Sequence, residues 1–262
     1  MEYLVICAVS LVVAGLTLFS GFGLGTILLP AFAIFFPIPI AVAATAVVHL
    51  ANNLFKVVLV GKHANRGIVV AFGIPAIAFA AIGAALLGYL SGLEPILRYG
   101  LGAVRCEVMW VKVVVATLIA GFSLMEILPR FQDLAFDAKY VPLGGVLSGF
   151  FGGLSGLQGA LRSAFLIRCG LDKEAFIGTG VVLAVVVDLS RLAIYGSTFL
   201  LAHVGSLQGS GVMNLTLAGM VAAFVGSAIG VRLLRKTTIR AVQLIVSVML
   251  IALSMALAAG LI

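Results

Sequence analysis

Long apolar runs dominate this sequence and restrict its fold more than any other feature. The runs cover residues 3–36, 40–60, 68–93, 108–128, 141–169, 175–200, 212–231 and 241–262. Most reach about 20 residues, the length that a helix needs to cross the hydrocarbon core of a bilayer. They are continuous rather than alternating with a period of two, which favours helices over a β-barrel. The sequence therefore predicts an all-α polytopic membrane protein.

Composition and charge restrict the function. Hydrophobic residues make up 63% of the chain and charged residues only 10%, so the net charge of +7 has no soluble basic domain in which to form a nucleic-acid surface. Basic loops on one side of a membrane explain that charge instead. The cysteines, Cys7, Cys106 and Cys169, are far apart and show no CxxC spacing. We therefore expect core thiols, and neither a metal nor another cofactor.

The two halves of the chain resemble each other. A displacement of 135 residues aligns Ser20-Gly21 with Ser155-Gly156, Asn53 with Asp188, Lys56 with Arg191 and Gly61 with Gly196. We predict a first repeat at 1–128, a connecting loop at 129–140 and a second repeat at 141–262, each with a glycine-broken first segment and three further transmembrane helices. Interrupted segments at corresponding positions indicate a transporter site between the repeats. Chance alignment of glycine-rich sequence is the alternative.

Basic loop residues bear on the topology. If all eight runs cross the membrane, these residues divide eight against four. If runs 3–36 and 141–169 instead enter and return as hairpins, ten share one face: Lys62, Arg66, Arg130, Lys139, Arg168, Lys173, Arg232, Arg235, Lys236 and Arg240. Only Arg98 and Arg105 then oppose them, which the positive-inside rule favours. This second arrangement makes the repeats inverted, although glycine breaks also occur in helices that cross.

The stretch 144–166 is the most unusual part of the sequence, because it combines many glycines with one arginine inside an apolar run. Glycine breaks helices and lets backbone approach a ligand, so we interpret the stretch as the lining of a site. We expect Arg162, with backbone N–H groups after Gly156 and Gly159, to hold an anion. Neutral neighbours are expected from both halves: Ser155, Gln158, Ser163, Ser20, Gly21 and Asn53. A structural salt bridge or a snorkelling side chain is the alternative for the arginine.

Asp188 and Arg191 lie one turn apart in an apolar helix, so they can pair on one helix face. The pair is either structural or a coupling element in which Asp188 changes its protonation as substrate moves. His49 is either a proton carrier or a hydrogen-bonded core residue. Lys56 supplies another cation, and snorkelling explains it equally well. Tyr195, near a segment end, is expected to anchor the helix at the membrane interface.

One motif suggests an enzyme. Gly153-Leu154-Ser155-Gly156 resembles the GxSG motif of intramembrane serine proteases of the rhomboid type, and His203 follows on a later segment. Against this interpretation, Ser20-Gly21 recurs in the first half without a comparable histidine. A duplicated glycine break suits a pore better than a single nucleophile.

The stretch 144–166, continuing through 170–180 to 187–195, resembles the sulfite exporter TauE/SafE family of membrane permeases. The first-half break resembles that family's other glycine signature, over Ser20-Gly21-Phe22-Gly23-Leu24-Gly25 and Pro30. The resemblance implies duplicated halves and transport of sulfite, sulfonates, sulfoacetate or related organic anions across the bacterial inner membrane. Many members carry a triple glycine followed by proline where this chain has Leu157-Gln158-Gly159-Ala160-Leu161-Arg162. Its substrate therefore need not be sulfite.

Together these features predict a multi-pass permease, not an enzyme, that binds a small sulfur-containing anion between two glycine breaks. An anion channel is the first alternative and a serine protease using Ser155 the second. The expected partners are the anion, membrane lipids and a coupling cation such as the proton. The possible coupling residues are His49, Lys56, Asp188 and Arg191. The anion, the direction of transport and homo-oligomer formation stay open.

Overall fold

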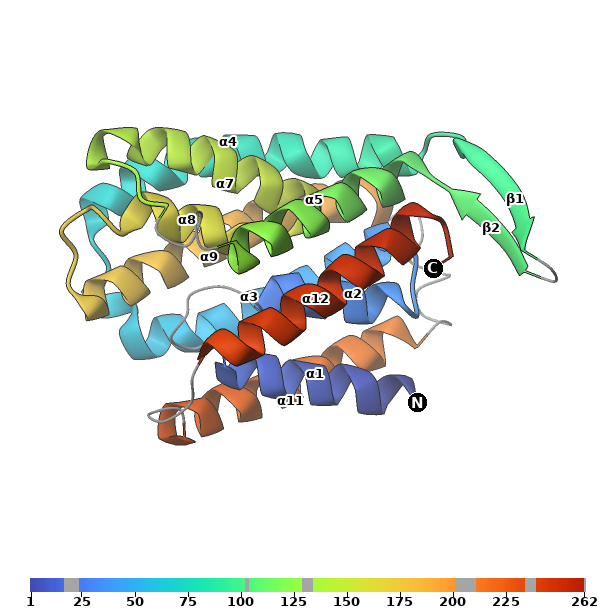
Figure 1. Cartoon of the computed structure of the whole chain (residues 1–262). Coiled ribbons are helices and arrows are strands. Elements are labelled where there is room, and N and C mark those ends of the chain that lie inside the picture. Colours follow the sequence, from blue (N-terminus) through green and yellow to red (C-terminus); the bar gives the residue numbers. More distant parts are fainter. Residues whose placement is uncertain (17–23, 102–103, 129–133, 201–210, 234–238, 262) are drawn as a thin grey trace.

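The computed structural model describes residues 1–16, 24–101, 104–128, 134–200, 211–233 and 239–261. In that part of the chain the fold is predominantly helical, as the sequence predicts (Figure 1). The first half contains α1 (Glu2–Leu16), α2 (Leu24–Ala33), α3 (Ile38–Val60), η1 (Gly61–His63), α4 (Arg66–Ser91), β1 (Leu97–Leu101), β2 (Val104–Val108) and α5 (Trp110–Ile127). The second half contains η2 (Ala138–Tyr140), α7 (Val141–Ser155), α8 (Gly159–Leu166), α9 (Lys173–Tyr195), η3 (Gly196–Leu200), α11 (Val212–Leu233) and α12 (Ile239–Ala258).

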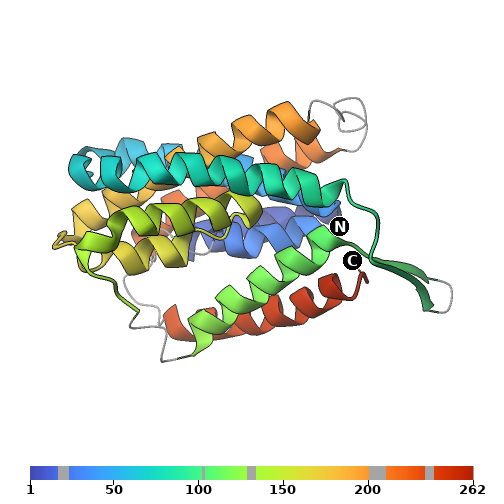
Figure 2. The same ribbon diagram turned by 90° about the horizontal axis from the view of Figure 1, so that it is seen from above.

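Several of these helices fit a membrane. Within the described residues, four helical stretches are long and apolar enough to cross one: Ile38–His63, Arg66–Ser91, Lys173–Thr198 and Val212–Ile229. Shorter apolar helices cover Glu2–Gly15, Trp110–Met125 and Ser247–Ala258. The axes of all these helices run in broadly similar directions, with both termini and the β hairpin at one end (Figures 1 and 2). A helical membrane bundle is therefore the architecture of this chain.

The glycine-broken segments each return to the end of the bundle at which they start. The start of α1 and the end of α2 both lie toward the end with the β hairpin, whereas α7 starts and α8 ends at the opposite end (Figures 1 and 2). The second break is local: Gly156 takes a left-handed conformation with φ of 82° and ends α7, and α8 begins at Gly159. Glycine adopts this conformation without a Cβ clash, so a helix stops readily there. The first break, at 17–23, lies outside the described residues.

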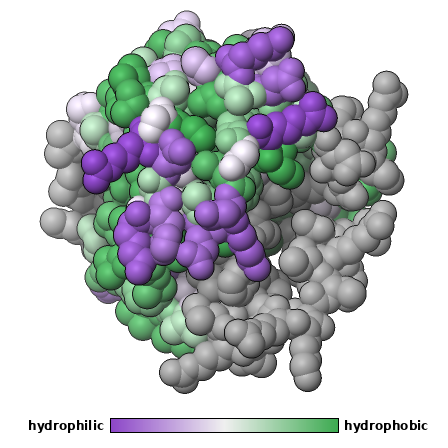
Figure 3. Space-filling view, turned by 90° about the vertical axis from the view of Figure 1, so that its left-hand side faces the viewer, coloured by the Kyte–Doolittle hydropathy of each residue, from purple (hydrophilic) through white to green (hydrophobic). Residues whose placement is uncertain are grey.

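The bundle end opposite the β hairpin carries a concentration of hydrophilic side chains (Figure 3). The basic residues on the described elements and loops at this end include Lys62, Arg66, Lys139, Arg168 and Lys173. At the other end stand Arg98 and Arg105 of the hairpin and Lys112 of α5, so the described basic residues are unequally divided.

A two-stranded antiparallel hairpin, β1–β2, is the feature that the all-helical prediction omitted. Its strands lie between α4 and α5 and bring Arg98 opposite Glu107, where Arg98 Nε is 3.2 Å from a carboxylate oxygen. Cross-strand charge pairs of this kind stabilise a short hairpin. Tyr99 Oη also donates to the Ala259 carbonyl at 2.5 Å, which ties the hairpin to the chain end after α12. The apolar runs alone could not reveal a pairing between such short strands.

Glycine allows two helix pairs to pack backbone against backbone. On α7, a Cβ added at Gly145, Gly149 or Gly153 would collide with the carbonyl groups of Phe72, Ala76 and Ala80 on α4. On α11, a Cβ at Gly226 would collide with the Leu11 carbonyl of α1. Small residues at such spacing permit close approach of helices in membranes. The pairs α4–α7 and α1–α11 are accordingly the most extensively packed in the described fold.

Replacing Gly149 with alanine is expected to destabilise the protein. The added Cβ would lie 2.7 Å from Ala76 Cα, and overpacking of this kind costs about 1–3 kcal/mol. Thermal unfolding in detergent measures the effect. The control is Gly121→Ala in α5, where an added Cβ meets nothing within 4 Å and the helix gains propensity. Equal melting temperatures for the two variants would contradict the packing explanation.

Helices of the first half pack in pairs on helices of the second half. The first helix of each half packs on a helix of the other half, α1 on α11 and α7 on α4, while α3 packs on α9 and α5 on α12. Both α3 and α9 have 23 residues, and adding 135 to the bounds of α3 gives the bounds of α9. The facing pair α3 and α9 carries the polar residues considered next.

Candidate functional site

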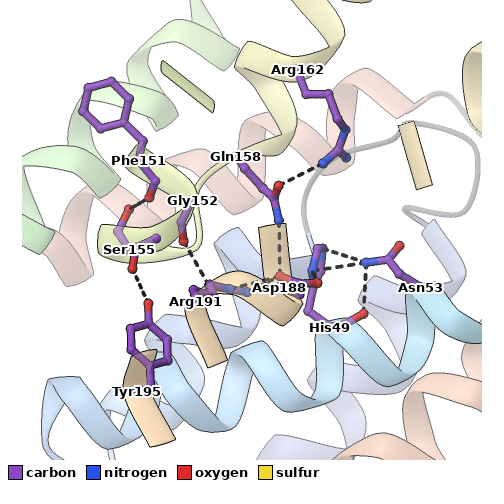
Figure 4. A network of polar contacts seen from close by, with 11 residues as sticks. His49, Asn53, Phe151, Gly152, Ser155, Gln158, Arg162, Asp188, Arg191 and Tyr195 are labelled. Carbon is purple, nitrogen blue, oxygen red and sulfur yellow. Dashed lines mark hydrogen bonds and ion pairs between the residues drawn. The ribbon is translucent and has the colours of Figure 1, made fainter. Parts of the chain in front are cut away.

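A contact between α3 and α9 joins the two halves of the chain inside the bundle. His49 is the middle residue of α3, about 17 Å from each end of that helix at 1.5 Å per residue. Its Nδ1 lies 2.6 Å from Asp188 Oδ2 on α9 (Figure 4). Asn53, one turn further along α3, donates from its side-chain amide to the His49 carbonyl at 2.9 Å. The contact therefore places a carboxylate and an imidazole midway along a helix that is long and apolar enough to cross a membrane.

Asp188 is fully buried and well supplied with donors. Its Oδ1 accepts from Arg191 Nη2 at 2.7 Å, from Arg191 Nε at 3.0 Å and from Gln158 Nε2 at 3.2 Å. Arg191 is also fully buried, and the pair lies one turn apart on α9. A buried carboxylate is tolerated when its charge is paired and its lone pairs are occupied.

The break after α7 packs directly on this pair. Arg191 Nη1 donates to the Gly152 carbonyl at 3.2 Å, and the Tyr195 hydroxyl donates to the Gly153 carbonyl (Figure 4). A Cβ at Gly156 would lie 2.7 Å from Arg191 Nη1, so glycine leaves room for the guanidinium. The C-terminal end of a helix carries partial negative charge, which a cation stabilises. Arg191 thus fixes both Asp188 and the end of α7.

Gln158 and Arg162 extend the network along α8. The Gln158 amide donates to Asp188 and accepts through Oε1 from Arg162 Nη1 at 3.3 Å. Ser148 Oγ holds the Gln158 backbone by donating to its carbonyl at 3.0 Å. Arg162 is only 5% exposed, and a Cβ at Gly180 of α9 would lie 3.6 Å from its Nε. Arg162 therefore lies against α9 at Gly180.

Four charged side chains are buried in or near the site. Among the described residues, the buried charged side chains are Lys56, Arg162, Asp188 and Arg191. Three of them are cations and one is a carboxylate. Lys56, on α3, is 6% exposed. Charges buried inside a membrane bundle are costly and often mark substrate pathways.

Comparison with known proteins gives the family. Residues 6–257 match the family described as Sulfite exporter TauE/SafE, which is nearly the whole chain. The chain belongs to the sulfite exporter TauE/SafE family. No curated protein and no solved structure matches it. Membership of the TauE/SafE family implies a membrane transporter of sulfite or related sulfur anions.

In this TauE/SafE chain the structure brings most of the expected site residues together. One network joins His49, Asn53, Gln158, Arg162, Asp188 and Arg191. Lys56, on α3, is also buried. Gly156 and Gly159 flank the break between α7 and α8, and Ser163 lies on α8 next to Arg162. Ser20 and Gly21 lie outside the described residues.

Ser155 has a different environment from the one that a nucleophile needs. It is buried, and in the described part of the chain its hydrogen bond is to the Phe151 carbonyl of its own helix at 3.0 Å. Serine hydroxyls often bond back to their own helix in this way. The expected base, His203, lies outside the described residues. Within those residues, the geometry gives the protease interpretation no nucleophile and base in contact.

Tyr195 is the residue whose role the sequence misplaced. We expected an interfacial anchor, but its side chain is fully buried and bonds the Gly153 carbonyl. The face of α9 on which Tyr195 lies explains its burial. Asp188, Arg191 and Tyr195 are spaced i, i+3 and i+7, so they lie on one face of α9. That spacing could have indicated from the sequence that Tyr195 belongs to the same polar cluster as Asp188 and Arg191.

Proposed function

We propose that this TauE/SafE protein is a secondary transporter that binds a small sulfur-containing anion at the network between α3, α8 and α9. The observation that carries this proposal is that four charged side chains, Lys56, Arg162, Asp188 and Arg191, are buried among the described residues. Intramembrane charges are costly and mark substrate pathways. Arginine suits sulfite, sulfonate or carboxylate groups because its planar guanidinium binds two oxygens at once.

We further propose that residues 1–128 and 141–262 are inverted repeats. Two observations support this. The first helix of each half packs on a helix of the other half, α1 on α11 and α7 on α4, and each broken segment returns to the end of the bundle at which it starts. Substrate sites of such transporters lie between the repeats at broken helices. Rocking of one half against the other would then open the site to each side in turn.

The orientation follows from the basic residues. The end that carries η1, η2 and the start of α9 faces the cytoplasm in our proposal, because positively charged loops are retained there. The β hairpin and both termini then lie on the outer side of a bacterial inner membrane.

Proton coupling is proposed for the His49–Asp188 contact. A proton added to Asp188 would neutralise the carboxylate that faces His49, Arg191 and Gln158. The site would become more positive and would bind an anion more tightly. By linkage, a bound anion would favour the proton equally, so the two would move together.

Transport by reconstituted protein tests the proposal. Proteoliposomes are expected to take up sulfite or a sulfonate at a rate that saturates with concentration, and other sulfur anions should compete. Liposomes without protein provide the background. Saturation separates a carrier from a channel, which would instead pass ionic current in planar bilayers far above carrier turnover. Absence of flux and of binding for every sulfur anion tested would overturn the assignment.

A further inference from the structure

The segment that connects the two halves of the chain is attached to α8. The Phe136 N–H donates to the Ala164 carbonyl at 3.0 Å. The Phe136 ring stacks on the Phe165 ring, with 4.2 Å between the ring centroids and 14° between the planes. Asp137 also lies 3.4 Å from Arg168, which follows α8. Because that ion pair is exposed and contributes little, the stacked rings and the backbone hydrogen bond make the attachment.

The backbone of α7 contacts the same phenylalanine of α8. A Cβ added at Gly144 would lie 2.5 Å from Phe165 Cγ, so glycine lets α7 approach the ring. Phe165 is 1% exposed and belongs to a cluster of buried apolar residues that includes Val141 of α7 and Leu183 and Val187 of α9. The end of α8 is therefore held by α7, α9 and the connecting segment together.

This attachment lies one turn from Arg162. With eight residues, α8 is about 12 Å long and cannot span a bilayer, so contacts near its two ends set its position. Near the first end, Ser148 Oγ donates to the Gln158 carbonyl. Near the second end lies the stack of Phe136 on Phe165. Arg162 lies between them, four residues after Gln158 and three before Phe165.

We infer that Phe136 is a positioning residue for anion binding, which acts through Phe165 and α8 on Arg162. This inference rests on the proposed transport function. A guanidinium binds two oxygens at once only when its plane is correctly oriented, and a loosely supported binding group loses affinity. Without the Phe136 ring, α7 and α9 alone would hold the end of α8, and Arg162 would sample several orientations.

Anion binding by the detergent-purified full chain tests the inference. Phe136→Ala is expected to weaken the binding of methanesulfonate or sulfite, measured by calorimetry, by about tenfold. In proteoliposome uptake it should raise the KM and leave the maximal rate nearly unchanged, because the change acts on binding. Phe136→Tyr keeps the stacked ring at a half-buried position and should restore native affinity. The matched control is Phe36→Ala, which removes a half-buried ring that follows α2 and should leave affinity unchanged.

A double-mutant cycle separates positioning from a general loss of stability. A lysine at position 162 has a flexible stem and a compact charge, so it depends less on the orientation of α8. Adding Phe136→Ala to Arg162→Lys should therefore cost less than about threefold in affinity. A further loss of the full tenfold in the double variant would overturn the inference.

Native affinity in a folded Phe136→Ala protein would overturn it as well. Should that variant fail to fold, Phe136→Leu decides in the same way, because it keeps an apolar side chain and removes the stacked ring. Binding that is lost in Arg162→Ala but kept in Phe136→Ala would refute the positioning role alone. Absence of sulfur-anion binding to the native protein would instead refute the proposed function.

Discussion

Arg162→Ala is expected to lower the affinity for sulfite or a sulfonate by about a hundredfold or more, a loss of about 3 kcal/mol. The guanidinium is buried, lies beside Gly180 and is held by Gln158, so no other described side chain can take its position without moving α8. Isothermal calorimetry and proteoliposome uptake measure this loss.

Two controls make this result interpretable. Arg162→Lys keeps the charge but loses the bidentate fork, and we expect an intermediate affinity. Arg168→Ala removes an arginine two residues after α8 that is 57% exposed and 3.4 Å from Asp137, so binding should be unchanged. A folded Arg162→Ala protein with native affinity would show that the anion binds elsewhere.

Asp188→Asn is expected to destabilise the protein by about 3–5 kcal/mol, because it leaves Arg191 buried without its carboxylate. The double variant Asp188→Asn with Arg191→Gln should recover much of this loss, since removing both charges leaves no uncompensated ion. Melting temperatures in detergent measure both. A single variant as stable as the native protein would mean that the pair contributes little.

The same variant also tests the proton proposal. With Asp188→Asn the site is permanently more positive, so methanesulfonate should stabilise this variant more than it stabilises the native protein. Methanesulfonate keeps its charge across the pH range used, so a change in its affinity reports on the protein alone. Native affinity should rise as the pH falls from 6 toward 4, the range in which carboxylates begin to take up protons, whereas that of D188N should vary less. Parallel pH profiles would remove Asp188 from the coupling step.

Much of the helical framework could be predicted from the sequence, because helix length and apolarity are local properties. The run 40–60 is α3 (Ile38–Val60), and the run 175–200 corresponds to α9 with η3. The β hairpin could not be predicted in the same way, since the pairing of Arg98 with Glu107 depends on two short strands meeting. The second glycine break was predictable because Gly156 has a local reason to end a helix.

In the candidate site, too, local contacts could be predicted and contacts between distant segments could not. The spacing of Asp188 and Arg191 already predicted their contact, since residues three apart share a helix face. Nothing local indicated that His49 would reach Asp188 from the other half, or that Gln158 would connect Asp188 to Arg162. Tyr195 was misplaced because nearness to a helix end is a weak guide when a carbonyl of another helix is within reach.

The contacts of α9 with α7 differ from its contact with α3. Arg191 and Tyr195 donate to two successive carbonyls of α7, and glycines of α7 pack directly on α4, so hydrogen bonds and backbone packing hold these three helices together. Between α3 and α9, the side-chain hydrogen bond in the described part of the chain is that between His49 and Asp188. Protonation of Asp188 would therefore weaken the polar link between these two helices, where the two halves of the chain meet.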